Sequence, residues 1–142
     1  MLQAAAKNIQ LKITNSVDDA QVLCDYNMIL TILRNLTSNA IKFSHPNTTI
    51  KIDIIDFPMD NNYIQVSVKD SGVGIEEESV WKLFRIDEKV TSTTGTNNEG
   101  GTGLGLILCK EFIDKHSCKI WVESVLGEGT TFFFTLKKAN HQ

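Results

Sequence analysis

Two asparagines and a lysine are spaced along Asn35-Leu36-Thr37-Ser38-Asn39-Ala40-Ile41-Lys42 so that all three fall on one face of a helix. The side-chain oxygen of an asparagine such as Asn39 can ligate Mg²⁺ as a neutral hard ligand. The ammonium group of Lys42 can meet a phosphate as a point charge. A solvated polar face is the alternative interpretation, and this motif taken alone favours it.

A second motif, Asp70-Ser71-Gly72-Val73-Gly74-Ile75, directly follows a segment with the pattern of a strand. Gly72 and Gly74 allow the backbone to turn sharply and to approach a flat ligand closely. The carboxylate of Asp70 can accept a hydrogen bond from an exocyclic amine such as that of adenine. An ordinary strand-to-helix turn is the alternative, since Asp-x-Gly turns are common.

The third motif is the glycine-rich segment Gly100-Gly101-Thr102-Gly103-Leu104-Gly105-Leu106 at the predicted start of a helix. Its backbone N–H groups and the positive end of the helix dipole suit a phosphate. The glycine spacing matches neither a P-loop nor a dinucleotide-binding fingerprint. A last pair of glycines, in Gly127-Glu128-Gly129, is predicted to form a plain hairpin turn.

Hydrophobic periodicity predicts the elements that would position these groups. A long helix is expected over 26–43, with Asp25 as its N-cap and Pro46 after its end. Alternating isoleucines and valines over 50–54 and 64–68 predict an antiparallel hairpin. Shorter segments predict small strands over 11–14 and 22–24, a short helix over 76–84, a helix over 103–116, and strands over 119–125 and 130–136. This order predicts an α+β fold, one sheet with helices on one face.

Composition bounds the class of protein. The 142 residues suffice for one domain, and a net charge of −3 without a Lys/Arg block weighs against nucleic-acid binding. No apolar run approaches the roughly 20 residues of a membrane span. Cys24, Cys109 and Cys118 lack metal-site spacing, so we expect reduced cysteines and no zinc site. The expectation is a cytoplasmic domain without nucleic-acid or membrane contact.

The order of the motifs is more specific than any one of them. Together with Leu83-Phe84-Arg85, they closely resemble the N box, first glycine box, F box and second glycine box of sensor histidine kinases, from about residue 7 to 136. The resemblance implies the Bergerat ATP-binding fold of gyrase, heat-shock chaperone and mismatch-repair ATPases. That fold is an α+β two-layer sandwich, with a mixed, mainly antiparallel sheet and helices on one face. Residues 1–142 are then a single catalytic and ATP-binding domain.

The resemblance also implies roles for individual residues. Asp70 would read the adenine amine, Asn39 would ligate Mg²⁺, and Asn35 and Lys42 would contact the phosphates as the catalytic pair. Residues 87–100 would form a lid over ATP. The remaining residues assigned to the nucleotide site are Gly72, Gly74, Ile75, Phe84, Gly101, Thr102, Gly103, Leu104, Gly105 and Leu106. Phe84 would pack the near end of the lid, although a phenylalanine at this spacing is usually a core residue.

Asn35 separates a kinase from an ATPase. The ATPases of this fold have a carboxylate one helical turn before the Mg²⁺-ligating asparagine, where it acts as general base for water. Asn35 occupies that position and cannot take a proton at neutral pH. We therefore expect transfer of the γ-phosphate to a histidine of a separate dimerisation domain. An ATPase switch of the same fold and a degenerate, non-catalytic interaction module are the alternatives.

The three histidines, His45, His116 and His141, all lack the expected phosphoacceptor context. The chain is therefore interpreted as an excised catalytic domain, with residues 1–6 as the remnant of a preceding helix. Alone it should bind ATP, be monomeric and have no histidine of its own to phosphorylate. The expected partners are the histidine-bearing dimerisation domain of the parent kinase and the receiver domain of a response regulator.

Two departures from the family pattern limit the assignment. Ser117-Cys118 stands where two glycines are usual after the last helix, which puts the turn there in doubt. The lid segment 91–98 is nearly uncharged, so its phosphate contacts stay unassigned. Arg85 or Lys89 could reach the phosphates, and a solvated charge is an equal alternative for each.

Overall fold

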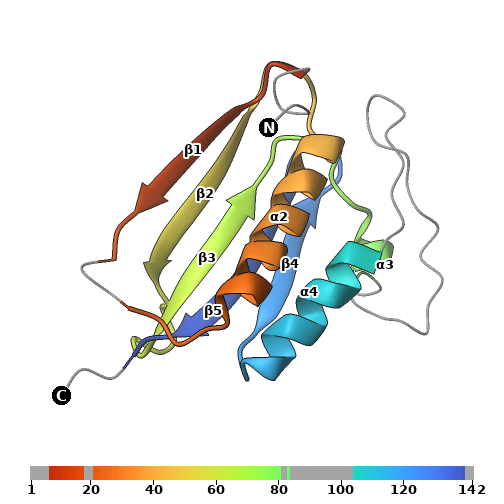
Figure 1. The fold of residues 1–142 in the computed structure, drawn as a ribbon. Helices are drawn as coiled ribbons and strands as arrows, with labels where there is room; N and C mark the ends of the chain where they lie inside the picture. The colour runs from red at the N-terminus through yellow and green to blue at the C-terminus, as the bar shows by residue number, and fades with distance from the viewer. Residues whose placement is uncertain (1–6, 18–20, 81–82, 84–103, 140–142) are drawn as a thin grey trace.

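The fold, seen in a computed structural model that describes residues 7–17, 21–80, 83 and 104–139, is built on a five-stranded sheet (Figure 1). The strand order is β1-β2-β3-β5-β4. β1 pairs with β2 in parallel, and all other neighbours are antiparallel. The strands are β1 Gln10–Asn15, β2 Thr49–Asp56, β3 Tyr63–Lys69, β4 Ile120–Val125 and β5 Gly129–Lys137.

The helices are α2 Tyr26–Phe43, α3 Glu77–Val80 and α4 Leu104–Lys115. Figure 1 shows α2 and α4 side by side on one face of the sheet. The prediction of an α+β two-layer sandwich with a mixed, mainly antiparallel sheet is therefore confirmed. None of the helices in the described segments is long and apolar enough to cross a lipid bilayer.

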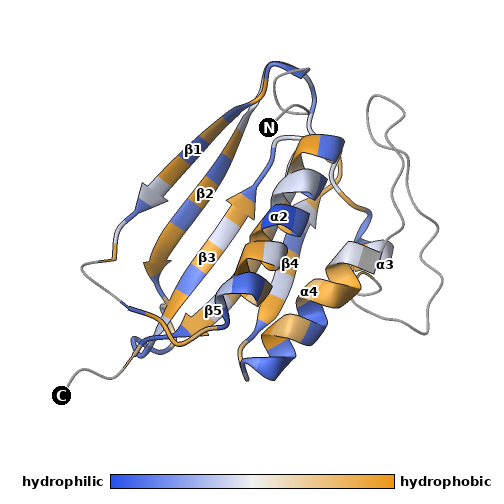
Figure 2. Ribbon diagram, in the orientation of Figure 1, coloured by the Kyte–Doolittle hydropathy of each residue, from blue (hydrophilic) through white to orange (hydrophobic). Residues whose placement is uncertain are grey.

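The core lies between the sheet and the two long helices. Residues at alternate positions of β5, namely Phe132, Phe134 and Leu136, point into it. Figure 2 shows bands of hydrophobic and hydrophilic residues along β1 and β2. Ile32 on α2 and Ile113 on α4 are completely buried against these side chains. The packed layer holds the carboxyl end of α2 and the end of β3 in fixed positions.

The small strand predicted over 22–24 is wrong. Val22 makes only an isolated bridge with Lys138 beyond the end of β5. Asp25 already caps α2, so the extended segment is too short to continue the ladder. In the helix predicted over 76–84 the structure describes α3 and a turn at Leu83, while residues 81–82 and 84 lie outside the described residues.

Ser117 resolves the doubt about the turn after α4. It adopts the left-handed conformation with φ 54°, which glycine usually takes at this position. The N–H of Ser117 donates to Asp114 O at 3.0 Å, and that of Cys118 donates to Ile113 O at 3.1 Å. These two bonds are those of a Schellman motif, so the helix ends normally without the glycine.

Candidate functional site

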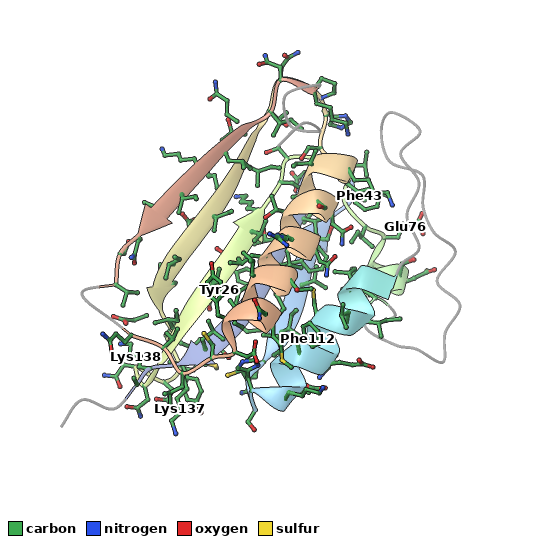
Figure 3. The ribbon with its side chains drawn as sticks, in the orientation of Figure 1. Tyr26, Phe43, Glu76, Phe112, Lys137 and Lys138 are labelled. Carbon is green, nitrogen blue, oxygen red and sulfur yellow. The ribbon has the colours of Figure 1, made fainter. Side chains whose placement is uncertain are left out.

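The predicted site residues lie along the carboxyl half of α2, at the end of β3 and at the start of α4. Figure 3 labels Phe43 and Glu76, which lie at this end of the molecule beside the start of α3. The backbones of Ser44 and Gly72 form an isolated bridge, which joins the end of α2 to the loop after β3. Tertiary packing thus brings the first two motifs into contact although roughly thirty residues separate them.

Asp70 is a buried carboxyl group, 4% exposed, at the end of β3. Its Oδ1 accepts hydrogen bonds from the N–H of Gly72 at 2.9 Å and of Thr130 at 3.2 Å. Oδ2 has no hydrogen-bond partner within the described part of the chain. Burial raises the pKa of this carboxyl above its ordinary value of 3.8, and the two N–H donors and nearby His45 offset part of the effect. A buried acceptor atom left open in this way suits a donor supplied by a ligand.

Glycine is required at positions 72 and 74 because backbone atoms of other segments lie too close for a side chain. A Cβ on Gly72 would lie 2.0 Å from Phe43 O, and one on Gly74 would lie 2.3 Å from Val125 O. Gly74 also has a positive φ of 74°, which disfavours any side chain. The loop is therefore pressed between the end of α2 and the β4–β5 hairpin, as the prediction of a tight backbone turn requires.

Asn35 joins the first motif to the third. A Cβ on Gly105 would lie 3.1 Å from Asn35 Oδ1, so α4 approaches α2 closely at this point. Cys109, one turn further along α4, is completely buried beside the same asparagine. Burial raises the pKa of the Cys109 thiol to about 11, and the Asn35 side chain offsets part of that rise. The thiol is therefore a neutral packing group.

The other predicted residues that the structure describes lie near the same part of the fold, and they make fewer contacts with one another. Asn39 and Lys42 are half-buried on α2, and Lys42 Nζ lies 5.0 Å from the centroid of the Phe43 ring. Ile75 donates its N–H to Ser124 Oγ at 2.7 Å. Leu106 is buried in the core. The geometry packs Asn35 against Gly105, and separately packs Asp70 against Gly72 and Gly129.

Sequence reasoning missed Thr130 and Ser124. Thr130 pairs with Asp70 through both backbone groups, and its hydroxyl lies 2.7 Å from Ser124 Oγ. Ser124 Oγ also donates to Gly129 O at 3.0 Å and accepts from Ile75, so it ties the loop to the hairpin. Thr130 is a polar residue on the core-facing row of Phe132 and Phe134, and this break in the pattern could have revealed it.

The Gly127–Gly129 turn is the predicted hairpin turn, and it also supports the site. Gly127 donates its N–H to Val73 O at 2.8 Å, and a Cβ on Gly129 would lie 2.2 Å from Asp70 O. The plain-turn interpretation was therefore incomplete. Several predicted parts fall outside the described residues, namely the helix remnant 1–6, Phe84, Arg85, Lys89, the lid 87–100, Gly101, Thr102 and Gly103, together with the side chain of Leu104.

This sheet, its single helical layer and the buried Asp70 at the glycine loop are those of an ATPase domain. Residues 24–140 match the family described as histidine kinase-, DNA gyrase B-, and HSP90-like ATPases, and the chain belongs to this family. The chain is 36% identical to the adaptive-response sensory kinase SasA of Prochlorococcus marinus, over 84% of its own length. It is 37% identical to the sensor histidine kinase WalK of Bacillus subtilis, over 87%.

Solved structures agree with the sequence relatives. The nucleotide-free catalytic domain of the histidine kinase ThkA has a TM-score of 0.79 and 30% identity, with 99% of this chain and 86% of that chain covered. ThkA in complex with the response regulator TrrA matches with a TM-score of 0.74 and 31% identity, over 97% of this chain and 36% of that one. The predicted resemblance to sensor histidine kinases is therefore confirmed, and the family assignment implies nucleotide binding.

The curated relatives are much longer than this domain. The chain covers 30% of the length of SasA and 20% of that of WalK. It corresponds to the ATPase-type catalytic domain of such proteins.

Proposed function

We propose that this domain binds Mg²⁺-ATP and presents its γ-phosphate to a histidine carried by another domain of a sensor histidine kinase. The observation that carries the proposal is the buried Asp70, with one oxygen held by two backbone N–H groups and the other open. An adenine amine would donate to the open oxygen. A carboxylate that accepts from a neutral amine in a buried site selects the base strongly.

Other residues would position the base, bind Mg²⁺ and contact the phosphates. Gly72 and Gly74 let the loop pack against Phe43 O and Val125 O, where no side chain fits, and they would thereby hold Asp70 in place for the base. Asn39 would hold Mg²⁺ through its carboxamide oxygen, a ligand type that suits this hard cation. Lys42, at the last turn of α2, would meet the phosphates as a point charge. ATP supplies the phosphoryl group.

Asn35 supports transfer to a protein rather than to water. Its side chain packs against Gly105 and Cys109, neither of which can take up a proton there at neutral pH. Neither Gly105 nor Cys109 could therefore act as a general base for water beside Asn35. The proposed partners are the histidine-bearing dimerisation domain of the parent kinase and a response regulator, a pairing that the ThkA–TrrA complex illustrates for a relative.

Calorimetric titration of the domain with a non-hydrolysable ATP analogue, with and without Mg²⁺, tests the proposal. We expect binding that Asp70→Asn weakens by roughly tenfold to a hundredfold, because one charge-assisted hydrogen bond is lost. Asp60→Asn makes the same change in the exposed β2–β3 turn and should bind like the wild type. Asn39→Ala should remove the Mg²⁺ dependence, whereas Asn27→Ala, on an exposed position of α2, should keep it.

Three results would decide between this proposal and the alternatives. Absence of binding at millimolar nucleotide would favour a non-catalytic module. Steady phosphate release by the isolated domain would favour an ATPase switch. Phosphorylation of a histidine-hairpin domain added in trans, without such release, is the result expected for a kinase domain.

A further inference from the structure

Lys7 is a buried lysine at the entrance to the domain, and none of the sequence motifs includes it. It is the first described residue, is only 4% exposed and is separated from the start of β1 by two residues. Its Nζ donates to Ile41 O at 2.9 Å, to Lys42 O at 2.9 Å and to Ser44 O at 3.2 Å. The ammonium group therefore covers the carboxyl end of α2.

This position suits a cation for a general reason. The last carbonyl groups of a helix have no partner inside the helix, and they form the negative end of its dipole. Ser44 contributes its own cap by donating its N–H to Ala40 O at 3.0 Å. Lys7 supplies the positive charge and three further hydrogen bonds, and such charge-assisted bonds are stronger than neutral ones.

One further carbonyl group at this helix end accepts a hydrogen bond from the glycine loop. Phe43 O, between two of the carbonyls that Lys7 holds, accepts the N–H of Val73 at 3.2 Å. The same oxygen is the atom that excludes a side chain at Gly72. Consecutive carbonyls of one turn thus contact Lys7 on one side and the loop that carries Asp70 on the other.

The backbone around Lys7 holds the same junction. Lys7 O accepts the N–H of Asn47 at 3.0 Å, and Gln10 donates its N–H to Thr48 O at 3.2 Å. Ile9, between them in sequence, is buried in the core. The segment that enters the domain is therefore fastened to both the end of α2 and the 44–48 loop, and it cannot shift without moving them.

We propose that Lys7 is a positioning residue for the nucleotide site. Its ammonium group fixes the carboxyl end of α2 and, through Phe43 and Val73, sets the position of the loop that holds Asp70. The inference rests on the proposed function for its effect on nucleotide affinity. Its effect on the loop can be measured without any nucleotide.

The test replaces Lys7 by methionine, which fills similar space without a charge or donor. We expect Lys7→Met to weaken binding of the non-hydrolysable ATP analogue about tenfold. We also expect the exchange rate of the Val73 amide, divided by that of the core amides of β5, to rise at least about tenfold above its wild-type ratio. Asp25→Ala is the matched control, because it weakens the other end of the same helix without touching the loop.

The control should change affinity less than about twofold, and its Val73 amide should keep the wild-type ratio to the β5 amides. Wild-type affinity and wild-type Val73 protection in folded Lys7→Met would overturn the inference. If Lys7→Met does not fold, Lys7→Gln, which keeps two donors, is measured instead, with the same expected direction and the same overturning result. Absence of nucleotide binding in the wild type would count against the proposed function, and Val73 exchange would still decide the role of Lys7.

Discussion

Both ends of α2 form hydrogen bonds with distant segments, but the bonds at the two ends differ in burial and in the groups that they connect. At the amino end Asp25 Oδ1 accepts the N–H of Met28 at 3.0 Å, and the N–H of Asp25 donates to His116 Nε2 at 2.9 Å. His116 Nδ1 lies 2.7 Å from Phe112 O, so the ring carries its proton on Nδ1. These contacts are neutral or exposed, and they join α2 only to the end of α4.

At the carboxyl end the contacts are buried and shared. Lys7 and the glycine loop bind neighbouring carbonyls of the same turn, and Asp70 lies immediately before that loop. A change at the amino end should therefore alter the stability of the helix. A change at the carboxyl end should alter stability and nucleotide affinity together. The comparison separates a helix end that only supports the fold from one that also shapes the site.

The largest expected effect comes from Gly72→Ala at the carboxyl end. The new Cβ would lie 2.0 Å from Phe43 O, a backbone atom that cannot move without displacing the end of α2. We expect the free energy of unfolding to fall by about 3 kcal/mol and nucleotide binding to be lost. Urea unfolding and calorimetric titration measure the two quantities.

Gly127→Ala is the control for this change. Its Cβ would meet no atom within 4 Å, so only the positive φ of 84° opposes the substitution. It should cost about 1 kcal/mol. Equal losses of stability in the two variants would show that the contact with Phe43 is not what requires glycine at position 72.

A smaller effect is expected from Asp25→Ala at the amino end. The variant loses the side-chain cap of α2 and should be less stable by about 1 kcal/mol. Urea unfolding measures this loss, and titration should give the wild-type affinity for the ATP analogue. A tenfold loss of affinity would contradict the distinction between the two ends of the helix.

The last prediction concerns how the free energy of unfolding changes with pH. Burial raises the pKa of Asp70 in the folded state, so the native protein binds more protons than the unfolded chain between pH 3.8 and that higher pKa. The stability that protonation of Asp70 contributes is therefore lost as the pH rises through this window. Asp70→Asn keeps an acceptor for Gly72 and Thr130 and removes the titration.

Unfolding free energies of wild type and Asp70→Asn, measured across the window, test this. The wild type should lose stability relative to the variant as the pH rises, and the difference should then become constant. Parallel curves would mean that Asp70 is not desolvated in the folded domain. Asp60→Asn, in the exposed β2–β3 turn, is the control for the effect of an Asp-to-Asn substitution away from the site.

Much of the fold could be predicted because its signals are local. The helix over 26–43 and its Asp25 cap follow from an apolar period and a good N-cap residue, and the structure has the same bounds. The hairpin of β2 and β3 follows from alternation in the same way. The strand over 22–24 was predicted wrongly because a short apolar run does not reveal how many partners its backbone will find.

Ser117 shows a second limit of local reasoning. A glycine is the usual signal for the left-handed end of a helix, and its replacement made the turn uncertain. Two backbone hydrogen bonds nevertheless hold Ser117 at φ 54°. Cys118, directly after this turn, packs against the hydrophobic core, a contact that the residue type at position 117 does not reveal.

The sequence by itself determined the helices, the strands of the hairpins and the chemistry offered by Asn35, Asp70 and the glycines. These depend on side-chain type and on short-range periodicity, which any reader of the chain can count. Only the tertiary structure decided that Thr130 and Ser124 hold the glycine loop and that Lys7 covers the end of α2. Such contacts join residues far apart in the chain, and packing between layers places them where no sequence spacing could show it.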